Sequence, residues 1–94
     1  MPLREVRAKI EKIDVQILSL IELRTALAKD VLDAKKAAGM QINDIEQNKM
    51  VLERAANSAT ERGLDGESVK RMFEILIKMN IERQHEMSGE GNLP

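Results

Sequence analysis

The sequence predicts an all-α protein with three helices per chain, and three observations support this fold class. Apolar residues recur at intervals of three and four along most of the 94-residue chain. Glycine and proline, which interrupt helices, fall between the periodic segments. No segment shows the strict alternation that is typical of a β-strand. We expect one long helix and two shorter ones in a single domain, because a chain of this length forms one core.

The long helix is expected to run from about Leu3 to Ala38. Pro2 is compatible with a helix start, no proline or glycine occurs in between, and Gly39 is suited to end it. Such a helix is roughly 50 Å long, whereas a compact domain of this size has a radius of gyration near 12 Å. Its apolar stripe must therefore extend beyond the other helices. We expect a second copy to cover it in an intertwined homodimer, which we prefer to a parallel coiled coil.

The two shorter helices are expected over residues 45–62 and 66–87. Asp44 and Asp65 precede them and are suitable N-cap residues. Gly63 separates them. The final residues, SGEGNLP, have the composition of a flexible segment. We therefore expect a helical domain over residues 1–88 and a flexible C-terminal tail over residues 89–94.

Composition argues against several classes of function. The 15 basic and 16 acidic residues leave a net charge of −1, which disfavours a nucleic-acid binder or a protein of anionic membranes. There is no cysteine and a single histidine, so we expect no metal and no cofactor. The sequence has no apolar run of membrane-spanning length and no signal peptide, and we expect a cytoplasmic protein.

Polar residues interrupt the apolar faces of the predicted helices. In the stretch LIELRTALAKDVLDAKK the spacing calls for an apolar residue at position 24, where the chain has Arg24. Lys35 lies at the edge of the same face, and on the last helix Asn80 and Gln84 continue an apolar stripe. Burying an unpaired guanidinium or amide costs on the order of several kcal/mol, so each needs a partner. One interpretation is a buried Arg–carboxylate pair that sets the register of the helices.

The other interpretation is a pocket for a small anion. No acidic residue stands three or four positions from Arg24, where the neighbours are Leu20, Ile21, Leu27 and Ala28. A guanidinium, an ammonium and two amides inside a helical bundle suit a ligand with carboxylates. The chain offers no evident nucleophile, general base or metal site. The chemistry must then depend on shape and charge alone.

The chain resembles the all-helical chorismate mutases over about residues 3–88. The stretches that carry the resemblance are VRAKIEKIDVQILSLIELRTALAKDVLDAK, INDIEQNKMVLERA and RMFEILIKMNIERQ. The resemblance implies an intertwined homodimer that rearranges chorismate to prephenate in aromatic amino acid biosynthesis, a branch of the shikimate pathway. This Claisen rearrangement needs no covalent step and no proton transfer. The enzyme holds a compact conformer and stabilises the charge that develops as the ether C–O bond breaks.

The resemblance also implies a role for individual residues. Arg24 would clamp one carboxylate of the substrate, and Arg7 would reach across from the other subunit to clamp the second. Lys35 and Gln84 would donate hydrogen bonds to the ether oxygen, and with Arg24 they are the candidate catalytic residues. Asp44 would position the substrate hydroxyl as well as cap its helix.

Three further positions belong to the expected binding site. Asn80 would add a polar contact near a carboxylate. Gln47 and Asn48 stand where many family members have Arg and Glu, and this neutral pair is expected to weaken substrate binding or alter hydroxyl recognition. Two alternatives stay open: an isochorismate pyruvate lyase on the same scaffold, and a non-catalytic dimerisation or regulatory module. Asp44 favours the mutase over the lyase.

Overall fold

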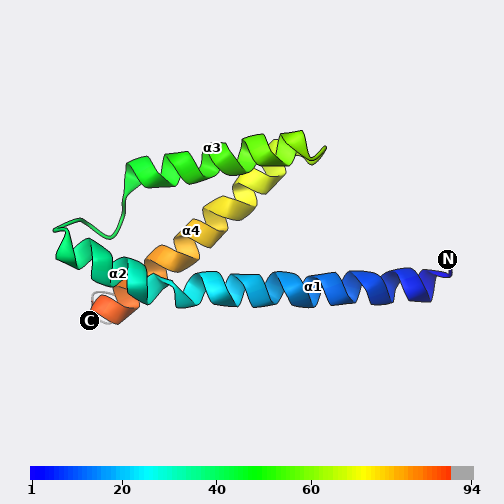
Figure 1. The fold of residues 1–94 in the computed structure, drawn as a ribbon, viewed down its shortest axis with the longest axis horizontal. Coiled ribbons are helices and arrows are strands. Elements are labelled where there is room, and N and C mark those ends of the chain that lie inside the picture. Colours follow the sequence, from blue (N-terminus) through cyan, green and yellow to red (C-terminus); the bar gives the residue numbers. More distant parts are fainter. Residues whose placement is uncertain (90–94) are drawn as a thin grey trace.

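The structure, a computed structural model, describes residues 1–89 of the chain, and this part is helical with no strand. Its helices are α1 (Leu3–Ala26), α2 (Ala28–Ala37), α3 (Ile45–Glu61) and α4 (Gly66–Ser88), arranged as Figure 1 shows. The predicted all-α fold class is confirmed. None of these helices is long and apolar enough to cross a membrane.

The predicted long helix is present, but it is divided at Leu27 into α1 and α2. The backbone continues through this point: the Leu27 N–H donates to the Leu23 carbonyl at 3.2 Å, and the Val31 N–H donates to the Leu27 carbonyl at 3.0 Å. Leu27 has a ψ of −9°, away from the usual helical value. A side chain from α4, that of Asn80, donates to the carbonyl of Arg24, three residues before Leu27. Side chains that enter the helical hydrogen-bond ladder are a recognised cause of such distortions.

The ends of the helices follow the predicted capping residues closely. The Asp44 carboxylate accepts from the Gln47 N–H at 3.2 Å, and the Asp65 carboxylate accepts from the Ser68 N–H at 3.3 Å. After α2 the chain turns at Gly39, whose φ of 69° lies in the left-handed region that favours glycine. The observed ends differ from the predicted ones by about one residue, which is the usual uncertainty at helix termini.

The predicted division between a domain over 1–88 and a tail over 89–94 stays a prediction. Helix α4 ends at Ser88, and Gly89 follows with a φ of 87°. Residues 90–94 lie outside the described part of the chain.

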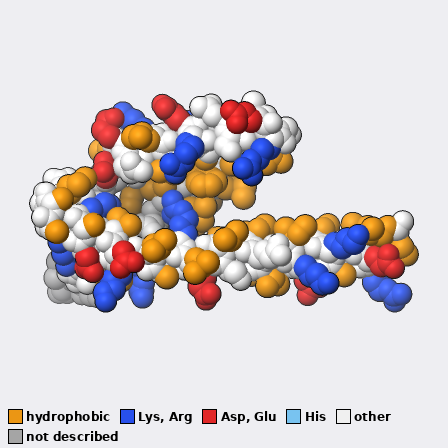
Figure 2. All heavy atoms as spheres, viewed as in Figure 1, with side chains coloured by type: hydrophobic (Ala, Val, Ile, Leu, Met, Phe, Trp, Pro, Cys, Tyr) orange, Lys and Arg blue, Asp and Glu red, His pale blue; other side chains and the backbone are white. Residues whose placement is uncertain are grey.

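The small core lies between α2, α3 and α4, and α1 extends away from it (Figure 1). Few apolar residues of the described part of the chain are buried, and most of them are small: Ala28, Leu32, Val51, Ala55 and Ala59. No residue of α1 is buried. Figure 2 shows a row of hydrophobic side chains along the edge of α1 on the side of α3 and α4, and the outer part of this row extends beyond them. The chain is correspondingly elongated, with extents of 54 × 26 × 23 Å.

Candidate functional site

A cavity of about 300 Å³ lies where α1, α2, α3 and α4 meet. Seven of the residues that the sequence assigned to the site line this one cavity, although they come from positions 24 to 84. They are Arg24, Lys35, Asp44, Gln47, Asn48, Asn80 and Gln84. The rest of the lining is Leu27, Val31, Val51, Arg54, Ile77 and Ile81. The cavity thus combines polar groups that can orient a ligand with apolar walls, as small-molecule sites do.

Arg24 and Asn80 connect α1 to α4 through a reciprocal pair of hydrogen bonds. Arg24 Nη1 donates to the Leu76 carbonyl at 3.0 Å, and Asn80 Nδ2 donates to the Arg24 carbonyl at 3.3 Å. The guanidinium has further N–H groups, so the contact with Leu76 holds its position without using all of its donors. The side chain is therefore anchored at the edge of the cavity.

A chain of hydrogen bonds continues from Asn80 to Lys35 through Gln84. Gln84 Nε2 donates to Asn80 Oδ1 at 2.6 Å, and Lys35 Nζ donates to Gln84 Oε1 at 3.1 Å. Gln84 is only 1% exposed, so its amide has no freedom to rotate into solvent. These bonds set the orientation of the amide, with its oxygen toward the ammonium and its nitrogen toward Asn80.

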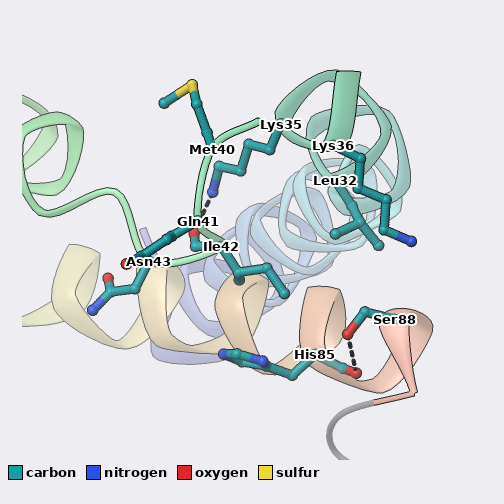
Figure 3. Close-up of a pocket in the computed structure, with 9 residues that line it drawn as sticks. All are labelled: Leu32, Lys35, Lys36, Met40, Gln41, Ile42, Asn43, His85 and Ser88. Atoms are coloured by element: carbon teal, nitrogen blue, oxygen red, sulfur yellow. Dashed lines mark hydrogen bonds between the residues drawn. The ribbon is translucent and has the colours of Figure 1, made fainter. Parts of the chain in front are cut away.

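Lys35 stands between the site and a second cavity, of about 390 Å³, on the other side of its side chain. Figure 3 shows this second cavity, in which the Lys35 ammonium donates to the Ile42 carbonyl of the loop that follows α2. Two of the three N–H groups of Lys35 are thus used by Ile42 and Gln84. The third is available to a ligand.

Helix α3 forms the opposite wall, beginning at its N-cap. Asp44 accepts from the Gln47 N–H, which confirms its capping role. Asn48 donates to Asn43 Oδ1 at 2.9 Å. The side chains of residues 44, 47 and 48 share the cavity because positions three and four apart lie on one helix face.

The cavity is positively charged. Arg24, Lys35 and Arg54 bring three cations to its lining and Asp44 the one carboxylate. Figure 2 shows Lys and Arg side chains in the hollow between α3 and the α1–α2 helix. Burial lowers the pKa of Arg24, and the charge of Arg54 lowers it further. Burial also lowers the pKa of Lys35, whereas the nearby Asp44 acts to raise it.

The interpretation of Arg24 as half of a buried Arg–carboxylate pair is wrong for the described part of the chain. Within residues 1–89 its recorded side-chain partner is the Leu76 carbonyl, and the ion pairs there are Lys49–Glu46, Lys78–Glu82 and Arg83–Glu86. No acid reaches Arg24 because its neighbours along the helix are apolar and the facing part of α4 is amide-lined. Within residues 1–89 its charge is therefore not paired with an acid.

Arg7 is the one predicted site residue that a single chain does not bring to the cavity. It is exposed on the free part of α1, seventeen residues before Arg24, which corresponds to roughly 26 Å along the helix. The expectation that it acts across a subunit boundary stays a prediction.

Sequence reasoning missed Arg54, which lines the cavity from α3. The signal was present, since the positions three and four away from it hold Met50, Val51, Asn57 and Ser58, none of them acidic. The same acid-free surroundings singled out Arg24. Arg54 was overlooked because it does not interrupt an apolar stripe and is exposed.

The arrangement is suited to hold a small anion and to place an ammonium and an amide against it. Within residues 1–89 no cluster of three His, Cys, Asp or Glu side chains is placed to hold a metal ion. Cations that backbone and amide partners hold in place stabilise negative charge that develops on a bound ligand, because the cations need little rearrangement during the reaction.

Comparison with known proteins agrees with this geometry. Residues 6–85 match the family described as chorismate mutase type II. A chorismate mutase of Methanocaldococcus jannaschii is 41% identical over 85 residues, which cover 88% of this chain and 86% of that protein. Bifunctional chorismate mutase/prephenate dehydratases of Enterobacter agglomerans and Escherichia coli K12 are 31% and 30% identical over 83 residues. These two matches include 88% of this chain but only 21% and 22% of the length of the bifunctional proteins.

The matched region begins in the first turn of α1 and ends in the last turn of α4, and it includes every residue that lines the cavity. The chain therefore belongs to the chorismate mutase type II family.

Proposed function

We propose that this protein is a chorismate mutase that rearranges chorismate to prephenate in the cavity between α1, α2, α3 and α4. The observation that carries the proposal is the arrangement of Arg24, Lys35 and Gln84 around one cavity in a chain of this family. Chorismate carries two carboxylates and an ether oxygen, so its recognition needs cations and hydrogen-bond donors at separate points of one small cavity. The cavity provides both kinds of group.

The catalytic roles follow from the donors that the hydrogen-bond network leaves available. Arg24, anchored on Leu76, presents its remaining N–H groups to a carboxylate and so restricts the conformers of the bound substrate. Lys35 presents its third N–H to the ether oxygen, and Gln84 adds the second hydrogen of Nε2. Negative charge develops on this oxygen as the C–O bond breaks. Both donors stabilise that charge more than they stabilise the ground state, which lowers the barrier.

Asp44, Gln47, Asn48 and Asn80 complete the proposed binding site. Asp44 lies beside the ammonium of Lys35, close enough to act on its pKa, and its carboxylate can accept from the substrate hydroxyl. The amides of the other three can donate or accept hydrogen bonds at the carboxylates and hydroxyl. No cofactor is assigned to the reaction.

We further propose that the active enzyme is an intertwined homodimer. The chain exposes 7508 Å², whereas a compact monomer of 10.6 kDa exposes about 5,500 Å². The excess of about 2,000 Å² per chain is in the range of permanent interfaces. An apolar groove of about 460 Å³ between α1 and α4, lined by residues such as Ile17, Leu20, Phe73 and Leu76, continues the exposed stripe. The α1 helix of a second copy carries the same apolar stripe and can cover both the groove and the stripe.

The dimer gives Arg7 a role. If two α1 helices pair antiparallel about the middle of residues 3–26, residue 7 of one lies level with residue 22 of the other. Arg7 of the partner subunit then lies within a helical turn of Arg24 and can clamp the second carboxylate. Each dimer would hold two such sites.

The relatives support a place in aromatic amino acid biosynthesis. In the bifunctional proteins one chain joins a chorismate mutase to a prephenate dehydratase, which consumes the product of the first reaction. We expect the protein to act in the cytoplasm, as the sequence led us to predict.

The test is to mix the purified protein with chorismate, follow its loss by absorbance and identify the product. Prephenate is the expected product, and Arg24→Leu should lower kcat/KM by roughly 100-fold or more, since it removes a charged hydrogen-bond donor to the substrate. Lys29→Leu is the matched control: Lys29 is exposed on α2 and does not line the cavity. Pyruvate released from isochorismate, without turnover of chorismate, would instead identify the lyase. Turnover of neither substrate would favour the non-catalytic module.

A further inference from the structure

Arg54 is the cation of the α3 wall of the cavity. It stands seven residues after Gln47 and three after the buried Val51, which places it on the same helix face as the other α3 residues of the cavity. The polar positions nearer the N-terminus of this wall, Gln47 and Asn48, are both neutral. The positive charge that α3 contributes to the cavity is therefore that of Arg54.

The surroundings of Arg54 do not neutralise it. No acid stands three or four positions away on α3. Within residues 1–89 it forms none of the ion pairs and none of the side-chain hydrogen bonds, whereas Lys49 on the same helix pairs with Glu46 at 3.7 Å. Its guanidinium thus keeps all of its donors for a ligand.

Arg54 and Arg24 act on one another across the cavity. The charge of Arg54 is the second cause, after burial, of the lowered pKa of Arg24. Two like charges that face one cavity from different helices repel each other until an anion lies between them. Arg24 is fixed by its bond to the Leu76 carbonyl, whereas Arg54 is exposed and can adjust. The pair therefore combines one anchored guanidinium with one that can close on a ligand.

We propose that Arg54 binds the substrate carboxylate that Arg24 clamps, and that it supplies from α3 the positive charge that Gln47 does not. The inference rests on the proposed function, because the ligand is the chorismate dianion. A carboxylate has four lone-pair sites, enough to accept from both guanidinium groups. With Arg54 in this role, the α3 wall keeps a cation that binds the substrate, although residues 47 and 48 are neutral.

The experiment compares Arg54→Gln with Arg62→Gln in steady-state turnover of chorismate. Arg62 caps the C-terminal end of α3, is exposed and does not line the cavity, so its substitution makes the same change of charge away from the site. Arg54→Gln should raise KM about 10-fold or more, as expected for a lost charge-assisted hydrogen bond, and Arg62→Gln should leave KM within twofold. Gln47→Arg added to Arg54→Gln should restore much of the lost affinity.

Thermal unfolding separates binding from a structural role. Because Arg54 repels Arg24, Arg54→Gln should leave the unfolding midpoint unchanged or raise it, even while KM rises. Equal KM values for Arg54→Gln and Arg62→Gln, with the native protein active on chorismate, would overturn the inference and leave the proposed function intact. A lowered midpoint that accounts for the lost affinity would also overturn it. A native protein without chorismate turnover would refute both proposals.

Discussion

Replacing Gln84 with methionine tests the hydrogen-bond chain that connects Lys35 to α1. Gln84 is 1% exposed and makes two side-chain bonds, one to the Lys35 ammonium at 3.1 Å and one to Asn80 at 2.6 Å. Methionine has nearly the same length and volume, so Gln84→Met removes both bonds without opening a cavity. The change therefore measures polar interactions and not packing.

The expected magnitude follows from the two bonds. A hydrogen bond from a charged donor contributes about 1.5–3 kcal/mol and a neutral one about 0.5–1.5 kcal/mol. Lys35 is half-buried and can recover part of its solvation from water, so the charged bond belongs at the low end of its range. We expect Gln84→Met to lower the free energy of unfolding by about 2–3 kcal/mol. It should also lower kcat, because the proposed site loses the Gln84 Nε2 donor to the ether oxygen and Lys35 loses the partner that orients it.

The stability assay is urea unfolding followed by far-ultraviolet circular dichroism, since the chain has no Trp or Tyr for fluorescence. Protomer concentration must be held constant, because the stability of a dimer depends on it. Glu82→Met is the matched control on α4: the Glu82 side chain is exposed, and its one ion pair within residues 1–89 is the long 3.9 Å pair with Lys78. A loss below about 0.5 kcal/mol for Gln84→Met, or one equal to that of the control, would show that these two bonds do not stabilise the fold.

Three further predictions concern charge, assembly and the α3 wall. Because the pKa of Lys35 is lowered from its ordinary 10.5, the unfolded chain binds more protons than the folded one between the lowered value and 10.5. In that window the free energy of unfolding of the native protein should rise with pH relative to that of Lys35→Met. Over the same range kcat should fall, because the ammonium loses its proton. Parallel stability profiles of the two proteins would contradict this. Ile13→Asp, on the exposed stripe of α1, should prevent dimer formation, as measured by analytical ultracentrifugation, and should therefore abolish turnover of chorismate. The neighbouring change Lys12→Asp should affect neither. The double change Gln47→Arg with Asn48→Glu should lower KM for chorismate, and an unchanged KM would show that the neutral pair does not weaken binding.

Some of the site followed from sequence because its residues break local patterns. Arg24 occupies a position where helical spacing calls for an apolar residue, and Asn80 and Gln84 continue an apolar stripe with amides. Such exceptions mark a site because burying polar groups without a ligand or partner is costly. Arg54 interrupts no apolar stripe, and its place in the cavity depends on how α3 packs against α4.

The hydrogen-bond partners within the site were beyond sequence reasoning. Which amide atom of Gln84 faces Lys35, and which carbonyl holds Arg24, depend on how α4 lies against the α1–α2 helix. The division of the long helix at Leu27 has the same origin. The sequence around it contains no glycine or proline, and the Asn80 side chain that enters the ladder comes from more than fifty residues away.

The fold class, the order and approximate ends of the helices and the unpaired apolar stripe of α1 could all be predicted from sequence, because periodicity and capping act between residues close along the chain. The sequence also indicated that cations and amides replace core residues. Three features come from the packing of the helices: these groups surround one cavity, their mutual hydrogen bonds leave particular donors available, and Arg54 joins them. These features depend on the placement of helices whose contacting residues lie far apart in sequence, and local spacing carries no information about that placement.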